Sequence, residues 1–401
     1  MRGIRLAGSP RCAHVITCLF QIIRRCALTF FAAKTARAVI AIPAKNEAEL
    51  IHACLASLAR QSEPADDIVL LVNNTTDCTA EIAHSLAASL RSRLHVHEVT
   101  LSHEHANAGT MRRFAMEKAA ELAGPQGAIL TTDADGQLPF DWVARNLAWL
   151  RAGYDAVCGR AVIDPADETL IPVHLLQDDW AETQYTALLD EIDHWVDPRP
   201  WDPWPRHTHR SGASIAVRSA VYAAVGGLPH VSHSEDRGFV ARLEHRDCKI
   251  RHDTEITVTV SGRHSGRARG GMAEAIARRI IKQDEWADDR LEMPQAALRR
   301  AELRCRARAV WQSPVHGLPS LASMLMLPPA QVERFMRSPW FGGAWADIES
   351  VSPVLRRMPI PMAALRDAIM EAKPILNQLR KTAVPSGTRL SRDPGLQALA
   401  E

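Results

Sequence analysis

Four short apolar runs recur in the first third of the chain, and stretches with helical spacing separate them. Each run is bounded by Pro, Asn, Asp or Gly, a pattern typical of buried strands. Segments 47–60 and 79–90 place Leu, Ile and Ala at the spacing of amphipathic helices. Alternating strands and helices predict a mostly parallel sheet with helices on both faces, an α/β fold. The predicted strands are 38–42, 68–72, 94–99 and 128–131.

Polar loops follow three of these predicted strands. They are Pro43-Ala44-Lys45-Asn46-Glu47, the segment 73–79 and the segment 133–136. In parallel sheets the ligand binds at the carboxyl ends of the strands, which lie along one edge. We therefore expect the three loops to converge on one site.

The charge of the chain is unevenly distributed. Residues 1–46 hold eight Lys or Arg and no acidic residue, whereas the remainder holds 40 basic and 46 acidic residues. The apolar patches at 15–31 are interrupted by one Gln and two Arg, so they fall short of the ~18 residues that a membrane span needs. We expect 1–36 to be a poorly ordered basic extension, with weak contact to an anionic membrane surface as the alternative. A signal peptide is a weaker option because no clean cleavage site follows the apolar patch.

Composition excludes several classes of protein. The formal net charge of +2 is too small to draw the whole molecule onto nucleic acid. Eight cysteines in 401 residues are too few for a disulfide scaffold, and none falls in a Cys-x-x-Cys pair. We therefore expect reduced thiols and a cytoplasmic protein.

The character of the sequence changes near residue 272. Helical stretches such as 273–281 and 361–379 then alternate with breaks rich in proline. The predicted organisation is an extension at 1–36, an α/β domain at 37–272 and a helical region at 273–401.

Within the α/β domain, the segment 164–210 is rich in Pro, Trp, Asp and His and is predicted to be a large, loop-like insertion. Sugar rings and similar acceptors stack well on tryptophan faces. Trp201 and Trp204 are flanked by prolines, which makes them the best candidates for an acceptor pocket. The alternative is that these tryptophans pack the insertion onto the C-terminal helices.

Asp133 and Asp135 lie two residues apart after a predicted strand, so both carboxylates project from one face if strand geometry continues. Mg²⁺ or Mn²⁺ is usually held by one or two carboxylates together with substrate phosphates. The pair therefore fits a site that a nucleoside diphosphate completes. The alternative is that Asp135-Gly136 forms an ordinary turn.

These features resemble the family 2 glycosyltransferases, which have the GT-A nucleotide-diphospho-sugar transferase fold. The resemblance runs from residue 38 to about 271. Five motifs follow the family's order, at 41–47, 72–79, 107–113, 133–135 and 226–229 with Glu235-Asp236.

The resemblance implies a role for each motif. Asp236 would be the general base, with Glu235 as the second choice, and transfer would invert the anomeric configuration. Mg²⁺ or Mn²⁺ would be held by Asp135 and Asp133, with His264 from a later loop. Residues expected to hold the nucleotide sugar are Pro43, Ala44, Asn46, Glu47, Asn73, Asn74, Asp77, Arg112, Arg113, Asp133, Arg263 and Arg267. Those expected on the acceptor side are Trp201, Trp204, Ser211 and Gly212.

The chain departs from the family's pattern in two places. The second loop carries Asn73 and Asn74 where acidic residues are usual, so amide side chains would form the hydrogen bonds to the nucleobase. The Arg-Trp motif of processive synthases is missing, which disfavours polymer synthesis. We therefore predict transfer from a nucleoside diphosphate sugar to a hydroxyl of a small or medium-sized acceptor.

Two alternatives stay open. A sugar nucleotidyltransferase also uses a parallel sheet and a metal, but usually has a glycine-rich first loop, which Pro43-Ala44-Lys45-Asn46 lacks. A degenerate domain that only binds a partner would lack the metal-binding acids and the base, yet Asp133, Asp135 and Asp236 are all present.

Overall fold

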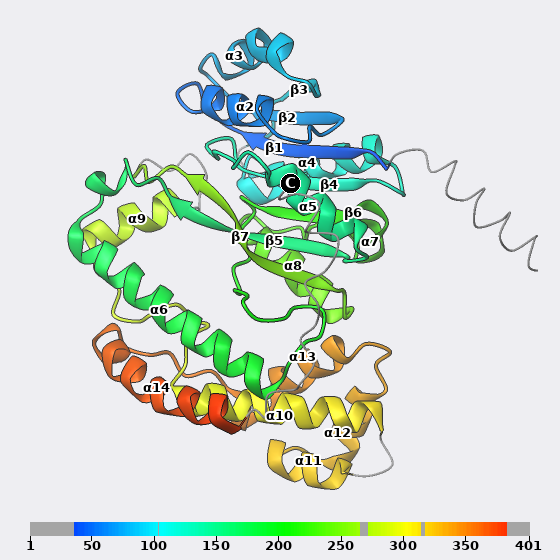
Figure 1. Ribbon diagram of the computed structural model, residues 1–401, viewed down its shortest axis with the longest axis vertical. Coiled ribbons are helices and arrows are strands. Elements are labelled where there is room, and N and C mark those ends of the chain that lie inside the picture. The colour runs from blue at the N-terminus through cyan, green and yellow to red at the C-terminus, as the bar shows by residue number, and fades with distance from the viewer. Residues whose placement is uncertain (1–35, 103, 265–271, 314–316, 383–401) are drawn as a thin grey trace, which may run out of the picture. The chain divides into compact units, whose positions relative to one another are not determined.

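A seven-stranded mixed sheet forms the centre of the chain, in the order β3-β2-β1-β4-β6-β5-β7 (Figure 1). The computed structural model describes residues 36–102, 104–264, 272–313 and 317–382. Only β6 runs against the other strands, because it pairs antiparallel with both β4 and β5. The strands are β1 (Ala38–Ala44), β2 (Asp67–Asn73), β3 (Arg93–Val99), β4 (Ala128–Thr131), β5 (Ala156–Ile163), β6 (Ile215–Arg218) and β7 (Ile250–Val260).

The predicted α/β fold is confirmed, and the four predicted strands correspond to β1 to β4. The strand β5 was not predicted, although its sequence AVCGRAVI is apolar at both ends. The expected extension 1–36 lies, except for Ala36, outside the described residues.

Helices cover both faces of the sheet because successive strand residues point to opposite sides. Ile40 and Ile42 pack with one set of helices, α2 (Ile51–Ala59), α3 (Thr79–Leu86) and α5 (Trp142–Arg151). Val39 and Ala41 pack with the other set, α4 (Ala108–Ala123), α7 (Ser219–Ala224) and α8 (Glu235–His245). Both faces of the interior strand β1 are therefore buried, which fixes its carboxyl end in position.

The segment 164–210 is not one long loop, because the 24-residue helix α6 (Val173–Val196) occupies its middle. One side of α6 packs through Tyr185 and Ile192 against α14 (Leu365–Thr382) (Figure 1). Its other side carries polar residues, so its apolar periodicity is weak and the helix was missed. The remaining C-terminal helices are α9 (Met272–Ile281), α10 (Pro294–Gln312), α11 (Leu318–Leu325), α12 (Pro329–Met336) and α13 (Phe341–Val351).

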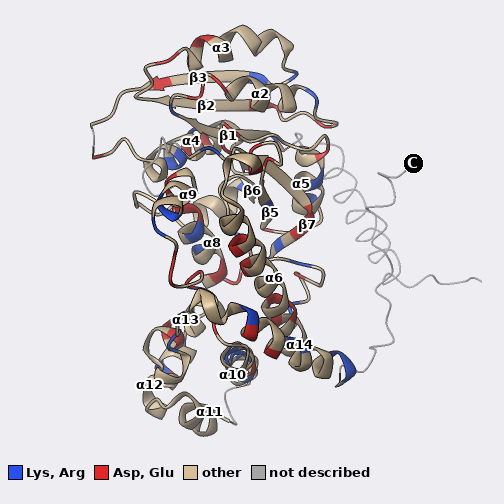
Figure 2. Cartoon of the chain, turned by 90° about the vertical axis from the view of Figure 1, so that its left-hand side faces the viewer, with Lys and Arg blue, Asp and Glu red and all other residues tan. Residues whose placement is uncertain are grey.

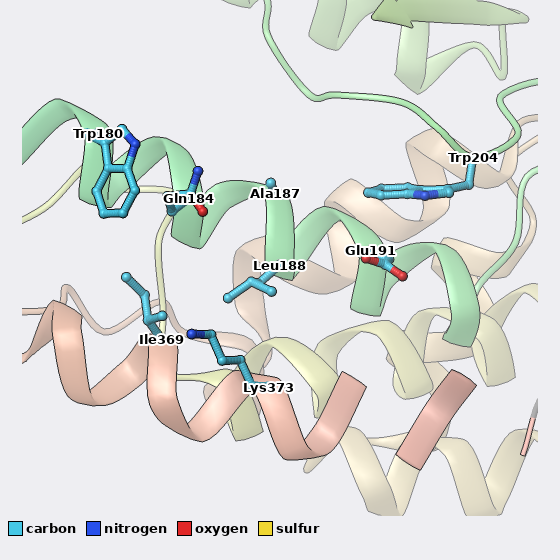
Figure 3. A pocket seen from close by; sticks show the side chains of 8 residues that line it. All are labelled: Trp180, Gln184, Ala187, Leu188, Glu191, Trp204, Ile369 and Lys373. Atoms are coloured by element: carbon cyan, nitrogen blue, oxygen red, sulfur yellow. The ribbon is translucent and has the colours of Figure 1, made fainter. Parts of the chain in front are cut away.

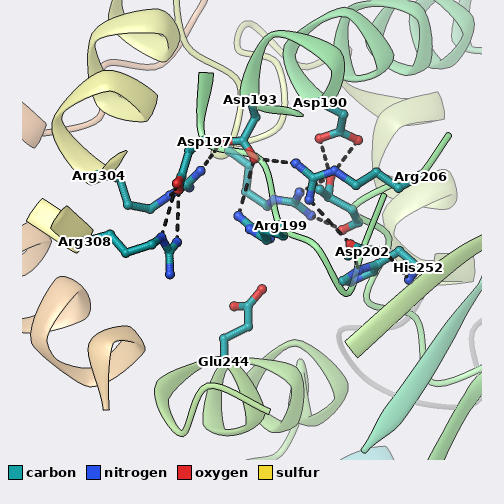
Figure 4. Close-up of polar contacts among 12 residues, drawn as sticks. Asp190, Asp193, Asp197, Arg199, Asp202, Arg206, Glu244, His252, Arg304 and Arg308 are labelled. Atoms are coloured by element: carbon teal, nitrogen blue, oxygen red, sulfur yellow. Dashed lines mark hydrogen bonds and ion pairs between the residues drawn. The ribbon is translucent and has the colours of Figure 1, made fainter. Parts of the chain in front are cut away.

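Opposite charges join α6 to α10. Helix α6 carries six Asp or Glu and no Lys or Arg, whereas α10 carries five Arg and one Glu (Figure 2). The junction is a buried cluster that we call the ion-pair network (Figure 4). It comprises Asp193, Asp197, Asp202, Arg199, Arg206, Arg251, His252, Arg304 and Arg308. The network fixes the chain after α6, which leads directly into the site.

Candidate active site

A cleft of about 950 Å³ opens at the carboxyl ends of β1 and β4. Helix α6, the segment 204–213 and the start of α8 form its other walls. Thirteen of the residues predicted from the sequence line it, namely Pro43, Ala44, Glu47, Asn73, Arg112, Asp133, Asp135, Trp204, Ser211, Gly212, Glu235, Asp236 and Arg263. The polar loops after β1, β2 and β4 therefore do converge on one site.

Asp133 and Asp135 follow β4 at the floor of the cleft. The amide of Gly136 donates to the carbonyl of Asp133 at 3.0 Å, so a turn is present as well as the acidic pair. A Cβ at Gly136 would lie 2.8 Å from the Thr132 hydroxyl, which explains why glycine follows Asp135. The turn and the pair are thus compatible, and the turn presents both carboxylates to the cleft.

Asp135 lies in a surplus of negative charge. Its pKa is raised to about 7, chiefly by burial and then by the charge of Asp133, with a smaller effect from Glu47. Arg263 opposes the rise, since its guanidinium lies 3.4 Å from Asp135. However, Arg263 also makes two hydrogen bonds of 2.7 Å to Glu47, so its positive charge is shared between Glu47 and Asp135. A cation would relieve the remaining repulsion.

Arg112 links the two sides of the cleft. Its buried guanidinium donates to Asp133 at 2.5 Å and to Glu235 at 2.9 Å. It also donates to the carbonyl of Gly212 at 3.0 Å, and a Cβ at Gly212 would lie within 2.7 Å of the guanidinium. Burial disfavours the charged guanidinium, but Asp133 and Glu235 outweigh this effect and raise the pKa of Arg112. Arg112 is therefore a permanent cation that holds the acidic loop against α8.

The adjacent acids Glu235 and Asp236 have different surroundings. Glu235 is 4% exposed and is paired with Arg112. Asp236 is half-buried in the cleft and accepts the amide hydrogen of Gly212 at 2.8 Å. Both lie in the first turn of α8, as the sequence predicted. Of the two carboxylates, that of Asp236 is the one open to a substrate.

Several predicted residues lie beside the cleft and support its loops. Asn74 has a φ of 43° and exchanges two hydrogen bonds of 2.9 Å with the backbone of Leu101. Asp77 accepts from the amide of Ala48 at 3.0 Å, and Asn46 accepts from the amide of Thr76 at 2.8 Å. These side chains tie the loops after β1 and β2 to each other and to the loop after β3.

Other predicted residues are placed away from the cleft lining. Arg113 pairs with Glu117 at 2.9 Å, and Trp201 is half-buried but does not line the cleft. The Nε2 atom of His264 is buried without a hydrogen-bond partner among the described residues. Arg267 lies outside the described residues.

Three lining residues carry chemistry that the sequence analysis missed. They are Arg160 in β5, His209 after α6 and Arg290 before α10. The Arg160 position could have been found by predicting β5, since its carboxyl half reaches the same edge of the sheet. Arg290 had no local signal, because its place in the cleft depends on how α10 packs.

Trp204 belongs to the lining of two cavities. It lines the main cleft and also a smaller groove of about 200 Å³ between α6 and α14 (Figure 3). Trp180, Gln184 and Leu188 from α6 line that groove together with Ile369 from α14. The indole therefore lines both the main cleft and the groove beside α14, and its role in acceptor binding stays a prediction.

The mixed sheet with helices on both faces and the helical C-terminal region have the arrangement expected of the GT-A fold. The sequence model of the family Glycosyl transferase family 2 matches residues 39–203. This part of the chain therefore matches the family that the motifs resemble, and the match supports a glycosyltransferase.

Solved structures with related folds show distant likeness. S. aureus TarS 1–349 in complex with UDP-GlcNAc is 16% identical, with coverage of 86% of this chain and 92% of that chain and a TM-score of 0.42. Mannosyltransferase PcManGT from Pyrobaculum calidifontis, in complex with GDP-Man and Mn²⁺, is 17% identical, with coverage of 91% and 78% and a TM-score of 0.40.

No curated protein matches the chain significantly. Among the described residues, no helix is both long and apolar enough to cross a membrane.

Proposed function

We propose that this chain is a metal-dependent, inverting glycosyltransferase. It moves a sugar from a nucleoside diphosphate sugar to a hydroxyl of a small or medium-sized acceptor. The observation that carries the proposal is the placement of Asp135 and Asp236 in one cleft, in two different electrostatic settings. The Asp135 carboxylate lies among other negative charges that are not fully compensated. The Asp236 carboxylate is open beside the amide of Gly212.

The residues at the floor of the cleft fit a hard divalent cation. Asp135 would be the main ligand, and Asp133, already bonded to Arg112, would position ribose or a metal-bound water. No group of three or more His, Cys, Asp or Glu in the described ranges is arranged to hold a metal. This fits Mg²⁺ or Mn²⁺, since such ions take one or two carboxylates and complete their shell with phosphate oxygens and water. When bound, the ion would supply Lewis-acid stabilisation of the departing diphosphate.

Asn73 is the best candidate to read the nucleobase. The residue is 1% exposed and lines the cleft, and its Oδ1 atom has no hydrogen-bond partner among the described residues. A buried amide oxygen without a donor costs free energy until a ligand supplies one. A ring N–H of the nucleobase would satisfy it.

In the transfer step, the Asp236 carboxylate accepts the proton of the acceptor hydroxyl. The hydroxyl oxygen forms a bond to the anomeric carbon while the bond from that carbon to the diphosphate oxygen breaks. Attack from the face opposite the diphosphate inverts the anomeric configuration. The Gly212 amide orients the Asp236 carboxylate, and Glu235 stays paired with Arg112.

Donor hydrolysis is the direct test of the proposal. The full chain, incubated with Mn²⁺ and separate UDP-, GDP-, ADP- and dTDP-sugars, should release a nucleoside diphosphate from one class of donor. EDTA should abolish this release. Release of pyrophosphate from a nucleoside triphosphate and a sugar phosphate would indicate a nucleotidyltransferase instead, and absence of both reactions would favour a binding module.

We place the reaction in the cytoplasm. The support is that the five cysteines in the described residues are all free thiols.

A further inference from the structure

The positively charged side chains of the cleft fall into two groups. Eight Lys or Arg line it, and five of these are ion-paired with an Asp or Glu of the chain. The other three are Lys45, Arg160 and Arg290, which have no ion-pair partner among the described residues. Lys45 lies on the donor side after β1, whereas Arg160 and Arg290 lie near His209, in the segment whose Gly212 amide contacts Asp236.

Arg160 is the more unusual of the two. It belongs to β5, where its neighbour on β7 is Thr257. Its Nε atom is buried and donates to no acceptor in the part of the chain that the structure describes. A guanidinium pairs strongly with carboxylate or phosphate oxygens, and a partly buried one without an acceptor is costly. An anionic ligand would supply the missing acceptor.

Arg290 faces the same part of the cleft. It donates to the Thr208 carbonyl at 3.0 Å and to the Thr208 hydroxyl at 2.7 Å. The hydroxyl in turn donates to Asp190 at 2.9 Å, and the charges of Asp190 and Asp288 act on Arg290 without a direct ion pair.

His209 completes the group as a neutral donor. Burial first, and then the charges of Arg160 and Arg290, lower its pKa to about 4. Its ring lies 5.2 Å from that of His207, whose Nδ1 accepts the His209 amide hydrogen at 3.0 Å. This hydrogen bond holds the backbone at His209 in place. The His209 ring itself has no hydrogen-bond partner among the described residues.

The group lies close to the proposed base. Gly212, whose amide donates to Asp236, is three residues after His209. Three residues of extended chain span at most about 10 Å. A small ligand bound at His209 can therefore place a hydroxyl beside Asp236.

We propose that Arg160, His209 and Arg290 form a subsite for an oxyanion, phosphate or carboxylate, on a small acceptor. The inference rests on the proposed function only where it calls the ligand an acceptor. Binding of the anion itself does not depend on sugar transfer.

Two measurements test the subsite. The first is binding of inorganic phosphate to the full chain, measured by ³¹P NMR line broadening. EDTA is present throughout, so that no metal assists binding at the donor site. Wild type should bind phosphate, whereas Arg160→Gln and Arg290→Gln should lose at least tenfold in affinity. Arg151→Gln, which removes an exposed arginine paired with Glu63, is the matched control and should bind like wild type.

The second measurement is transfer to matched acceptors, with glycerol, glycerate and glycerol 3-phosphate as one set and glucose, glucuronate and glucose 6-phosphate as another. An anionic member should be preferred at least tenfold over the neutral member of its set, and Arg160→Gln should remove this preference by raising the KM for the anionic member. The comparison of glycerate with glycerol 3-phosphate tells carboxylate from phosphate.

The outcomes separate the two proposals. Phosphate binding that depends on Arg160, in a chain that hydrolyses no donor, would support the subsite and refute the proposed function. Donor hydrolysis with no anion preference, together with equal phosphate affinity in wild type and Arg160→Gln, would overturn the subsite alone. Circular dichroism of each variant shows whether a loss is due to unfolding.

Discussion

Two groups of buried acids in this chain have opposite electrostatic surroundings. In the ion-pair network, burial alone would raise the pKa of Asp202, but the hydrogen bonds and charge of His252, with Arg206, hold it at about 2. At the floor of the cleft, the pKa of Asp135 rises to about 7 through burial and repulsion by Asp133. The network satisfies its charges within the protein, whereas the cleft leaves negative charge for a ligand to neutralise.

The largest expected effect follows removal of the Asp135 carboxylate. Asp135→Ala should lower transfer by about 10³-fold or more, because stabilisation of the departing diphosphate is worth several kcal/mol of barrier. The variant should stay folded by circular dichroism. Steady-state kinetics over a Mn²⁺ titration checks this prediction, and full turnover by the variant in excess EDTA would contradict it.

A change in the network should act on stability instead. Arg304 pairs with Asp193 and Asp197, and its side chain is 14% exposed. Arg304→Met should cost about 3 kcal/mol of the free energy of unfolding, because it leaves buried carboxylates short of a partner. Arg151→Met, at an exposed pair with Glu63, should cost less than about 1 kcal/mol. Urea titrations of both variants provide the comparison, and equal losses would show that burial of the network is energetically unimportant.

The two groups should also respond to pH in opposite directions. The raised pKa of Asp135 means that its contribution to stability is present below about pH 4 and is lost as the pH rises through 7. Without metal at pH 8, Asp135→Asn should therefore be more stable than wild type, by roughly 1–3 kcal/mol. The lowered pKa of Asp202 acts the other way, since its stabilisation is present above about pH 4 and is lost as the pH falls through 2.

Urea unfolding in EDTA at pH 5 and pH 8 measures the Asp135 effect. The gain in Asp135→Asn should shrink at pH 5. A variant that is less stable than wild type at pH 8 would show that Arg263 and Arg112 already neutralise the site.

The smallest effect is expected at the acceptor wall. Trp204→Ala should raise the KM for the acceptor by up to about tenfold, the range for loss of one aromatic contact. Donor hydrolysis should stay unchanged. Trp201→Ala is the matched control because Trp201 does not line the cleft. Equal effects of the two substitutions on the KM would argue that these tryptophans serve packing alone.

The sequence predicted the elements whose signals are local. The strands β1 to β4 and the loops after them follow from apolar runs and turn residues, and the start of α8 at Glu235 follows from the motif. Helix α6 was missed because the side that faces the cleft carries mostly polar residues.

The separate roles of the site residues could not be predicted from the sequence, because they depend on the tertiary structure. Asn73 and Asn74 are adjacent and alike, yet only Asn73 lines the cleft, and Asn74 holds Leu101. Likewise, Arg112 pairs with Glu235 across 123 positions, which leaves Asp236 as the open carboxylate. Such pairings between distant residues leave no periodic pattern in the sequence.

The most direct test of the account is the role of Asp236. Asp236→Asn keeps the shape of the side chain but removes the basic carboxylate, so transfer should fall by about 10²- to 10⁴-fold while nucleotide affinity stays within a few-fold of wild type. Proton NMR of the product first formed by wild type should show the anomeric configuration opposite to that of the donor. Retention of the donor's configuration, or transfer by Asp236→Asn at close to the wild-type rate, would contradict the mechanism.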